Sequence, residues 1–399
     1  MAKNNRGFST RAVHGGEGVR PADYVPVATP IHPSVGFIYD SMDDLDAIFA
    51  TTRPGYVYPR YGSPTVAAFE EAVADLEGGE AGFGFASGMA AVHVALLAAG
   101  VRAGTGVVAA LDLYGATTTL LERLMAQLGV TVRFVDTDDL AAVEAALKET
   151  RPAAFLAEII SNPLLKVADV PALTDLAHRY GATCLIDNTF ATPYLFTPLA
   201  CGADYVIHSA TKYIGGHGDV MAGVVVTSAE NRRKLYEANK LVGSVLGPFE
   251  AWLALRGVKT LPLRMRQQCA NAKAVAEWLT TRDGIGCVNY PGLPSHPQHG
   301  IARRLFGDRG FGGMVSFEIA GADKAKVFRF MESLELCLPA TTLGDVYTLV
   351  LHPATTSHRS LTPEDRARVG ISDGLARLST GIEDVEDIIA DLDEALNCC

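Results

Sequence analysis

The chain has 399 residues, of which 48% are hydrophobic and 20% are charged, a composition typical of a folded protein and not of a disordered one. Its 45 Asp and Glu outnumber its 34 Lys and Arg, and the formal net charge of −11 argues against general binding to the phosphate backbone of nucleic acid. The longest nearly uninterrupted apolar stretch, at 90–101, is shorter than the roughly 20 residues that a membrane-spanning helix needs.

The amino-terminal residues and the cysteines indicate a cellular compartment. No apolar core follows residues 1–6, so the sequence predicts no signal peptide. The seven cysteines are odd in number, and no pair has the spacing of a metal finger, which favours free thiols in a reducing environment. We therefore predict a cytoplasmic protein with no metal site, no nucleic-acid partner and no membrane anchor.

Residues 1–62 show little helical or strand periodicity. Prolines punctuate this segment at Pro21, Pro26, Pro30, Pro33, Pro54 and Pro59. Such a segment rarely folds alone, because it lacks the regular apolar pattern from which a core is built. We predict that residues 1–62 form an arm that lies over another surface, such as a neighbouring subunit.

Residues 63–256 follow a different pattern, in which short apolar runs alternate with helix-period stretches. The runs that predict strands are 82–86, 106–111, 130–135, 153–159, 183–187, 205–208 and 223–227. Between them, Leu140, Val143 and Leu147 recur at the spacing of one helix face, and 173–180 repeats this pattern. Short buried strands that alternate with amphipathic helices predict an α/β fold with a mostly parallel sheet covered on both faces.

Residues 257–399 predict a second, smaller α/β domain. A long helical stretch begins near Pro248 and runs through Trp278, and further strands are expected at 314–319 and 376–378. One side of a closing helix carries the apolar residues Val385, Ile388, Ile389, Leu392 and Leu396.

The carboxyl ends of parallel strands are where ligands bind in such folds. After the strand at 82–86, Ser87, Gly88 and Met89 open an apolar helix. Small residues at a helix start let an anion approach the backbone N–H groups, which indicates a phosphate site. Plain helix capping explains the same residues equally well when they are considered alone.

Two chargeable residues end further predicted strands. Asp187 closes a buried apolar run, where a carboxylate is costly unless it meets a cation or hydrogen-bond donors, as in a helix cap or a metal site. Lys212 follows the strand at 205–208, and Ser209 and Thr211 lie beside it. A buried lysine is a better nucleophile and can form a Schiff base with a carbonyl, whereas a solvated loop lysine is the alternative.

Together these features match the needs of pyridoxal phosphate (PLP), which are an anion cradle, an Asp for the ring nitrogen and a Lys for the aldehyde. Asp187 precedes Lys212 by 25 residues, enough for one helix and one strand, so both are expected to face one cleft. A P-loop is excluded because Lys212 precedes the glycines at 215–216 instead of following them.

The chain resembles the Cys/Met-metabolism family of PLP-dependent enzymes, which includes cystathionine γ-lyase, cystathionine γ-synthase and methionine γ-lyase. The resemblance extends from Ser9 to Asp384, and its most specific segment is 203–219, A-D-Y-V-I-H-S-A-T-K-Y-I-G-G-H-G-D. It implies the aspartate aminotransferase-like fold type I, with a mostly parallel sheet and a smaller C-terminal α/β domain.

The resemblance also implies cofactor-binding roles for the residues that match the family pattern. Lys212 is the residue that binds the PLP aldehyde and shuttles protons, and Asp187 pairs with the ring nitrogen. Tyr114 stacks on the ring and assists proton transfer, and Asn162 hydrogen-bonds the ring hydroxyl. The implied phosphate-binding residues are Ser87, Gly88, Met89, Ser209 and Thr211.

Substrate binding and assembly are implied in the same way. Arg377 is expected to clamp the substrate carboxylate with its bidentate guanidinium, and Thr342 assists it. Tyr58 and Arg60 lie in the arm, and in the family this pair reaches the phosphate of the neighbouring subunit; Tyr58 also contacts substrate. The resemblance therefore implies a homo-oligomer, a dimer-based tetramer, in which a lone monomer has an incomplete site.

The resemblance leaves more than one reaction open. Family members that act on cystathionine usually carry Glu where this chain has Tyr347, so the distal ammonium of cystathionine loses its partner. The segment Leu343-Gly344-Asp345 is similar to methionine γ-lyase, although Ala116 stands where that enzyme often has Cys. We expect γ-elimination from L-methionine or homocysteine to give 2-oxobutanoate, ammonia and a thiol.

Two alternatives lie within PLP chemistry: a cystathionine γ-lyase, and a γ-replacement transferase such as a cystathionine γ-synthase or O-acylhomoserine sulfhydrylase. A third, of another class, is a protein of this fold kept for binding or regulation. Loss of Lys212 or Asp187 would mark that class, and both are present.

Overall fold

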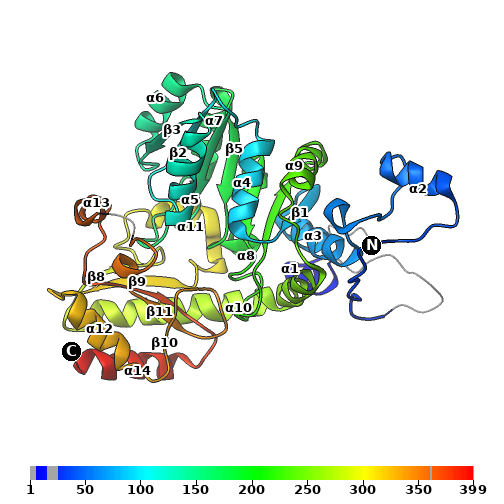
Figure 1. Cartoon of the computed structure of the whole chain (residues 1–399). Helices are drawn as coiled ribbons and strands as arrows, with labels where there is room; N and C mark the ends of the chain where they lie inside the picture. Colours follow the sequence, from blue (N-terminus) through cyan, green and yellow to red (C-terminus); the bar gives the residue numbers. More distant parts are fainter. Residues whose placement is uncertain (1–5, 16–25, 360–361, 399) are drawn as a thin grey trace.

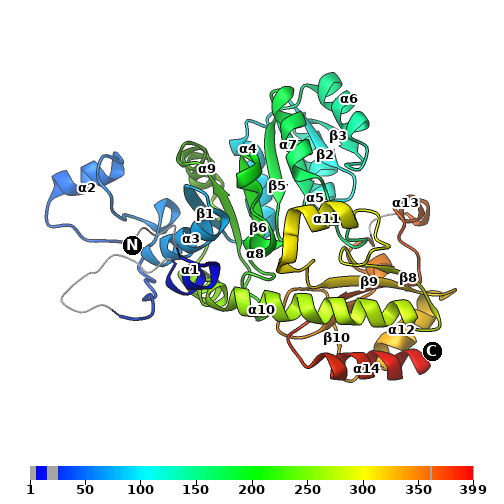
Figure 2. The same cartoon turned by 180° about the vertical axis from the view of Figure 1, so that it is seen from behind.

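The computed structural model describes residues 6–15, 26–359 and 362–398, so Pro21 and Cys399 lie outside the described residues. The chain forms two α/β units, each with its own sheet and hydrophobic core, and the long helix α10 (Pro248–Thr281) runs from one to the other (Figures 1 and 2). The boundary expected at 256/257 falls inside α10, and the division into domains stays a prediction.

The first sheet has seven strands in the order β1-β7-β6-β5-β4-β2-β3. Its strands are β1 (Ala81–Phe85), β2 (Gly106–Ala110), β3 (Thr131–Val135), β4 (Ala154–Glu158), β5 (Thr183–Asp187), β6 (Tyr205–Ser209) and β7 (Gly223–Thr227). β7 runs antiparallel to both of its neighbours, and the other pairings are parallel. All seven strands expected from the apolar runs are confirmed, and so is the mostly parallel α/β fold.

Helices cover both faces of this sheet, with α4 in front of it in Figure 1 and α7 in front of it in Figure 2. The helices are α3 (Pro64–Glu77), α4 (Gly88–Ala98), α5 (Gly115–Thr119, continued by a π-helix at Leu120–Met125), α6 (Leu140–Thr150), α7 (Val170–Arg179), α8 (Thr192–Leu195) and α9 (Ala229–Val242). The stripe expected on α7 is confirmed, since Leu173 and Ala177 are fully buried. The stripe expected on α6 is confirmed for Val143 and Leu147, which are fully buried, but not for Leu140, which lies at the start of the helix and is 37% exposed. Coverage on both faces explains why the interior strands are largely apolar, whereas the edge strand β3 contains Arg133 and is partly exposed.

The second sheet has five strands in the order β10-β11-β12-β9-β8. Its strands are β8 (Ile285–Asn289), β9 (Met314–Ile319), β10 (Leu338–Pro339), β11 (Leu349–Leu351) and β12 (Leu375–Ser379), and its helices are α11 (His299–Phe306), α12 (Lys324–Glu332), α13 (Pro363–Arg368) and α14 (Val385–Asn397). β9, β12 and α14 confirm the expected elements. β8, β10 and β11 were not predicted, because β8 is half-exposed and the other two are too short to show a period.

The arm contains two short helices that the sequence pattern does not reveal, α1 (Phe8–His14) and α2 (Met42–Phe49). Both are too short for a clear helical period. α1 packs against α3 and α10 of the same chain, whereas α2 projects away from both units (Figures 1 and 2). Apolar side chains between them are exposed to solvent, among them Val27 (91% exposed) and Ile38 (98% exposed).

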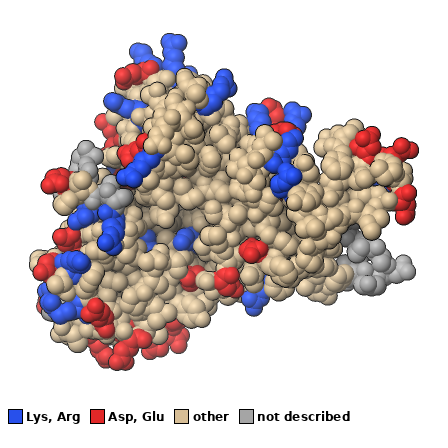
Figure 3. Space-filling view, viewed as in Figure 1, with Lys and Arg blue, Asp and Glu red and all other residues tan. Residues whose placement is uncertain are grey.

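The acidic excess of the sequence is visible on the surface, where acidic side chains gather over α2 and α14 in Figure 3. Asp43 and Asp44 lie in the first turn of α2, and Glu386 and Asp387 in the first turn of α14. Carboxylates at these positions stabilise the positive end of the helix dipole. In the part of the chain that the structure describes, no helix combines the length and the apolarity that crossing a bilayer requires.

Phe155 offers a test of the core, because it lies in the interior strand β4 and is fully buried. Phe155→Ala leaves a cavity that the surroundings fill only in part, so we expect the free energy of unfolding to fall by about 3–5 kcal/mol, measured by urea unfolding. Leu128→Ala, at a side chain that is 54% exposed, serves as the control and should change it by less than about 0.5 kcal/mol. Equal stability of the two variants would contradict this account of the core.

Candidate active site

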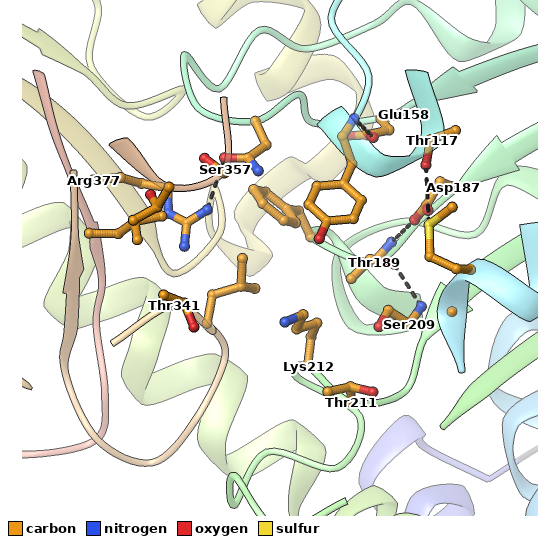
Figure 4. Close-up of a pocket in the computed structure, with 18 of the residues that line it drawn as sticks. Thr117, Glu158, Asp187, Thr189, Ser209, Thr211, Lys212, Thr341, Ser357 and Arg377 are labelled. Atoms are coloured by element: carbon orange, nitrogen blue, oxygen red, sulfur yellow. Dashed lines mark hydrogen bonds between the residues drawn. The ribbon is translucent and has the colours of Figure 1, made fainter. Parts of the chain in front are cut away.

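A cavity of about 590 Å³ opens where the carboxyl ends of β4, β5 and β6 face the second unit (Figure 4). Most of the residues expected from the sequence line it: Ser87, Gly88, Met89, Tyr114, Asn162, Asp187, Ser209, Thr211, Lys212 and Arg377. The strand-end argument explains this meeting, since parallel strands bring residues that are far apart in sequence to one edge of the sheet.

Lys212 follows β6 and points into the middle of the cavity (Figure 4). Its Nζ donates a hydrogen bond to Oγ1 of Thr342, at 3.0 Å. Desolvation lowers the pKa of Lys212, the positive charge of Arg377 lowers it further, and the negative charge of Asp345 acts in the opposite direction. The amine is therefore closer to its uncharged, nucleophilic form than a solvated lysine is.

A buried arginine of α10 holds the chain just after Lys212. Arg264 donates from Nη1 to the carbonyl of Tyr213 at 2.6 Å and from Nη2 to the carbonyl of Gly257 at 2.8 Å. Its side chain is only 3% exposed, and desolvation lowers its pKa to about 10. Arg264 was missed from the sequence because a lone Arg in a long helix usually indicates a solvated face.

The amino-terminal end of α4 supplies one wall of the cavity. The Ser87 hydroxyl caps the helix by accepting from the backbone N–H of Ala90 at 3.1 Å. Gly88 lies directly against Ser209, and a Cβ on Gly88 would approach Cβ of Ser209 to 2.8 Å, so only glycine fits. The first-turn N–H groups of α4 have no acceptor within the helix, and they point where an anion would bind.

Two carboxyl groups lie side by side at the adjoining wall. Asp187 of β5 and Glu158 of β4 are register partners in the sheet, and both line the cavity. Oδ1 of Asp187 accepts from the backbone N–H of Thr189 at 2.9 Å, and the Thr189 hydroxyl accepts from the backbone N–H of Ser209 at 2.8 Å. Oε1 of Glu158 accepts from the backbone N–H of Tyr114 at 2.5 Å.

Both carboxyl groups are shifted toward the protonated form by burial. Desolvation raises the pKa of Glu158 well above its usual value, and the nearby charge of Asp187 raises it further. Desolvation also raises the pKa of Asp187, whereas the hydrogen bonds from Thr189 and the charge of His208 oppose the rise. Glu158 and Thr189 were missed from the sequence, although both follow the same signal, a polar residue at the end of a buried strand.

Arg377 of β12 forms the opposite side of the cavity (Figure 4). Its Nη1 donates to Oδ1 of Asn162 at 3.0 Å, and its Nη2 donates to the carbonyl of Thr342 at 3.1 Å. The side chain is 3% exposed, and desolvation lowers its pKa to about 10. Its buried Nε has no hydrogen-bond partner among the described residues, so the guanidinium retains a donor for a ligand.

Four residues expected near the site are not among those that line this cavity, and one of them, Thr342, still contacts the site by accepting a hydrogen bond from Lys212. Tyr58 and Arg60 lie in the arm, where the Arg60 guanidinium stacks over the Tyr58 ring at 5.1 Å and donates to the carbonyl of Lys240 at 3.1 Å. Tyr347, expected beside the distal end of the substrate, is 54% exposed. Leu343 and Leu351 do line the cavity and provide apolar surface there.

A model of the Cys/Met metabolism PLP-dependent enzymes matches residues 9–397 of the chain. The chain belongs to this family. It is 43% identical to the L-methionine gamma-lyase of Fusobacterium nucleatum subsp. polymorphum, over 99% of both chains. It is also 43% identical to the O-succinylhomoserine sulfhydrylase of Pseudomonas aeruginosa, over 98% of this chain and 95% of the other. A cystathionine gamma synthase structure from Xanthomonas oryzae pv. oryzae matches with a TM-score of 0.92 and 38% identity, over 98% of each chain.

Membership of this family makes the protein a PLP-dependent enzyme that acts on an amino acid. The side chains in the cavity fit that cofactor. The helix start at Gly88 offers donors for a phosphate, Asp187 offers a carboxylate for a ring nitrogen, and the pKa of Lys212 is lowered as an amine that attacks an aldehyde requires.

Glu158 provides a test of the desolvated carboxyl pair. Because folding raises its pKa, the native state holds its proton more tightly than the unfolded chain, where a carboxyl titrates near pH 4. This contribution to stability is present below about pH 4 and is lost as the pH rises through the raised pKa. We expect Glu158→Gln, which cannot ionise, to gain stability relative to the wild type between pH 5 and pH 8.

The measurement is urea unfolding at both pH values, on protein freed of cofactor so that a bound ring adds no charge. Glu149→Gln, at an exposed position of α6, is the matched control and should behave like the wild type at both. A Glu158→Gln variant whose stability follows the wild type in parallel would show that Glu158 does not titrate differently in the native state.

Proposed function

We propose that the protein is a carbon–sulfur lyase that catalyses γ-elimination from L-methionine or homocysteine. The overall reaction takes up water and yields 2-oxobutanoate, ammonia and a thiol. The observation that carries the proposal is that Lys212, Asp187 and Arg377 line one cavity, together with an apolar wall that includes Leu343 and Leu351.

Each of these side chains has a task that its surroundings support. Arg377 binds the α-carboxylate of the substrate, for which it retains its unpartnered Nε. Lys212 accepts the proton from Cα at its Nζ, aided by a lowered pKa, and Thr342 orients that amine. Asp187 holds the ring nitrogen of the cofactor. PLP, when bound, withdraws electrons from the carbons next to the amino group.

The remaining family residues complete the cofactor site in this proposal. Tyr114 covers the ring from the cavity mouth, where it is 44% exposed. Asn162 faces the ring hydroxyl while its Oδ1 holds Arg377. The residues that bind the phosphate are Ser87, Gly88, Met89, Ser209 and Thr211.

The apolar wall favours an uncharged γ substituent such as a methylthio group, because burying a charged one there would be costly. The similarity to L-methionine gamma-lyases supports the same substrate class. The second candidate is γ-replacement, in which an added thiol takes the place of the leaving group. The similarity to an O-succinylhomoserine sulfhydrylase at equal identity supports this candidate.

The test is release of 2-oxobutanoate from L-methionine with no thiol added. We expect the wild type to release it and Lys212→Ala to be slower by about a thousandfold, because a lysine that transfers the proton typically contributes 10²–10⁴ in rate. Lys148→Ala, at an exposed position of α6, is the control for loss of a lysine. Keto acid that appears only with an added thiol would favour γ-replacement, and none under either condition would refute both.

We further propose that the protein is a cytoplasmic homo-oligomer, a tetramer made of two dimers. The free state of the six described cysteines supports the location. The exposed apolar side chains of the arm, among them Met42 at 74% exposure, support burial against a second copy. Tyr58 and Arg60 do not line the cavity of their own chain, which is consistent with a role at the site of a neighbouring subunit.

Hybrid oligomers test whether Arg60 serves the site of a neighbouring subunit. In a hybrid of Arg60→Ala and Lys212→Ala chains, one site combines an intact Lys212 with the partner subunit's Arg60 and should recover activity that both pure variants lack. The measurement is 2-oxobutanoate release from co-expressed, differently tagged chains purified on both tags. A hybrid of Lys212→Ala chains with chains that carry both Arg60→Ala and Lys212→Ala is the negative control, because no site in it retains Lys212. If Arg60 serves its own chain, the first hybrid stays as inactive as its parents.

A further inference from the structure

We propose that the buried carboxylate of Asp345 is the counter-charge of Lys212, and that its negative charge keeps this amine basic enough to accept the Cα proton of the substrate. Asp345 is not among the residues that line the cavity, so it acts through Lys212 and is a positioning residue. The inference rests on the proposed function, because it concerns the group that receives the proton in that reaction.

The loop that carries Asp345 packs directly against the chain at Lys212. Gly344 has a φ of +80°, and a Cβ on it would approach the backbone N of Tyr213 to 2.6 Å, so only glycine allows this contact. From the other side, Gln268 of α10 donates from Nε2 to the carbonyl of Asp345 at 2.7 Å. The carboxylate of Asp345 is therefore held at a fixed place beside the residue that bears the amine.

Folding removes the Asp345 carboxylate from water without giving it a full set of donors. Asp345 is 3% exposed, and its buried Oδ1 has no hydrogen-bond partner among the described residues. A buried carboxylate with an unused oxygen is costly unless positive charge lies nearby. A residue kept only as a hydrogen-bond acceptor does not need this charge, so the charge itself is the feature to be explained.

Two buried cations face this carboxylate. Desolvation raises the pKa of Asp345 and the charge of Asp219 adds to the rise, whereas the charges of Lys212 and Arg264 and the backbone N–H of Gly218 oppose it. The effect is mutual, because desolvation lowers the pKa of both Lys212 and Arg264 and the charge of Asp345 opposes that fall. Asp345 is thus a counter-charge that the two cations share.

Arg377 acts on the amine in the opposite sense. Desolvation and, after it, the positive charge of Arg377 lower the pKa of Lys212. A substrate carboxylate bound to Arg377 neutralises that charge, whereas the charge of Asp345 remains and favours the protonated amine. Lys212 is therefore a stronger base when the substrate is in place.

Other ionisable side chains also face the amine. Those that line the cavity with Lys212 and Arg377 are Tyr114, Glu158, Asp187 and Arg359. Desolvation shifts Glu158 and Asp187 toward their uncharged forms, because it raises the pKa of both. The carboxylate that raises the pKa of Lys212 is Asp345.

The test titrates the Lys212 amine itself, in the full chain freed of cofactor. Acetic anhydride reacts with the uncharged amine, and peptide mass spectrometry compares the acetylation of Lys212 with that of the exposed Lys148 in the same sample. The midpoint of this titration reports protonation and not access. Asp345→Asn keeps the shape but removes the charge, so it should move the midpoint to lower pH and raise acetylation near neutral pH by about threefold to tenfold.

Two further variants complete the titration. Asp219→Asn removes the same charge from an exposed position and is the matched control, whose midpoint should stay with the wild type because water screens that charge. Asp345→Ala lacks both the charge and the polar group, and it should shift the midpoint in the same direction as Asp345→Asn. An unchanged midpoint in Asp345→Asn and Asp345→Ala, or an equal shift in Asp219→Asn, overturns the inference.

The holoenzyme provides a second readout, the pH profile of kcat for release of 2-oxobutanoate. Proton transfer needs the uncharged amine, so the acidic limb of the profile should move to lower pH in Asp345→Asn, and the plateau should fall because the amine is a weaker base. A limb that stays at the wild-type position contradicts the inference. If no amino acid yields keto acid, the lyase proposal fails, and the midpoint of Lys212 still decides the role of Asp345.

Discussion

Desolvation of opposite charges in a single cavity is the constraint on which this site depends. Lys212 and Arg377 lose part of their preference for the charged form, and Asp187 and Glu158 lose part of theirs. A partner of opposite charge would therefore stabilise the charged form of each group. The uncharged amine of Lys212 can instead react with an electrophile. A cofactor with a phosphate and a ring nitrogen, and a substrate with a carboxylate, would satisfy these needs together.

The folded core supports the site from behind. Asn188 follows Asp187 in the sequence, and His208 precedes Ser209. The side chains of Asn188 and His208 turn to the opposite face of the sheet, where both contact the buried carboxyl group of Glu77. Oε1 of Glu77 accepts from Nδ2 of Asn188 at 2.8 Å and lies 2.7 Å from Nε2 of His208. Because side chains alternate along a strand, tying one residue on the back face fixes its neighbour on the front. The polar network at Glu77 thus helps to set where Asp187 and Ser209 point.

The strands could be predicted from the sequence because buried parallel strands are continuous apolar runs. The residues that end them could be predicted as site residues because the carboxyl ends of parallel strands share one edge of the sheet. Lys212 and Asp187 were predicted for the same reason, since each lies at the end of a predicted strand. Glu158 was missed although it carries this signal, because the strand was expected to continue past it to residue 159. Arg264 carries no local signal, since its partner Tyr213 is distant in sequence and is reached only when α10 packs against the segment after Lys212.

The choice between elimination and replacement does not depend on the residues that activate the substrate. In the proposed function, both reactions use the same proton transfer by Lys212 and the same carboxylate contact at Arg377, which is consistent with similar identity to relatives of both kinds. They differ in what is added at Cγ after the leaving group departs, which is a proton in elimination and the sulfur of a thiol in replacement. A thiol has to enter through the cavity mouth. There Met221 is 62% exposed and Tyr114 is 44% exposed, so the mouth of a single chain is open. If a neighbouring arm closes it, assembly and reaction choice are linked, because the arm then controls whether a thiol enters.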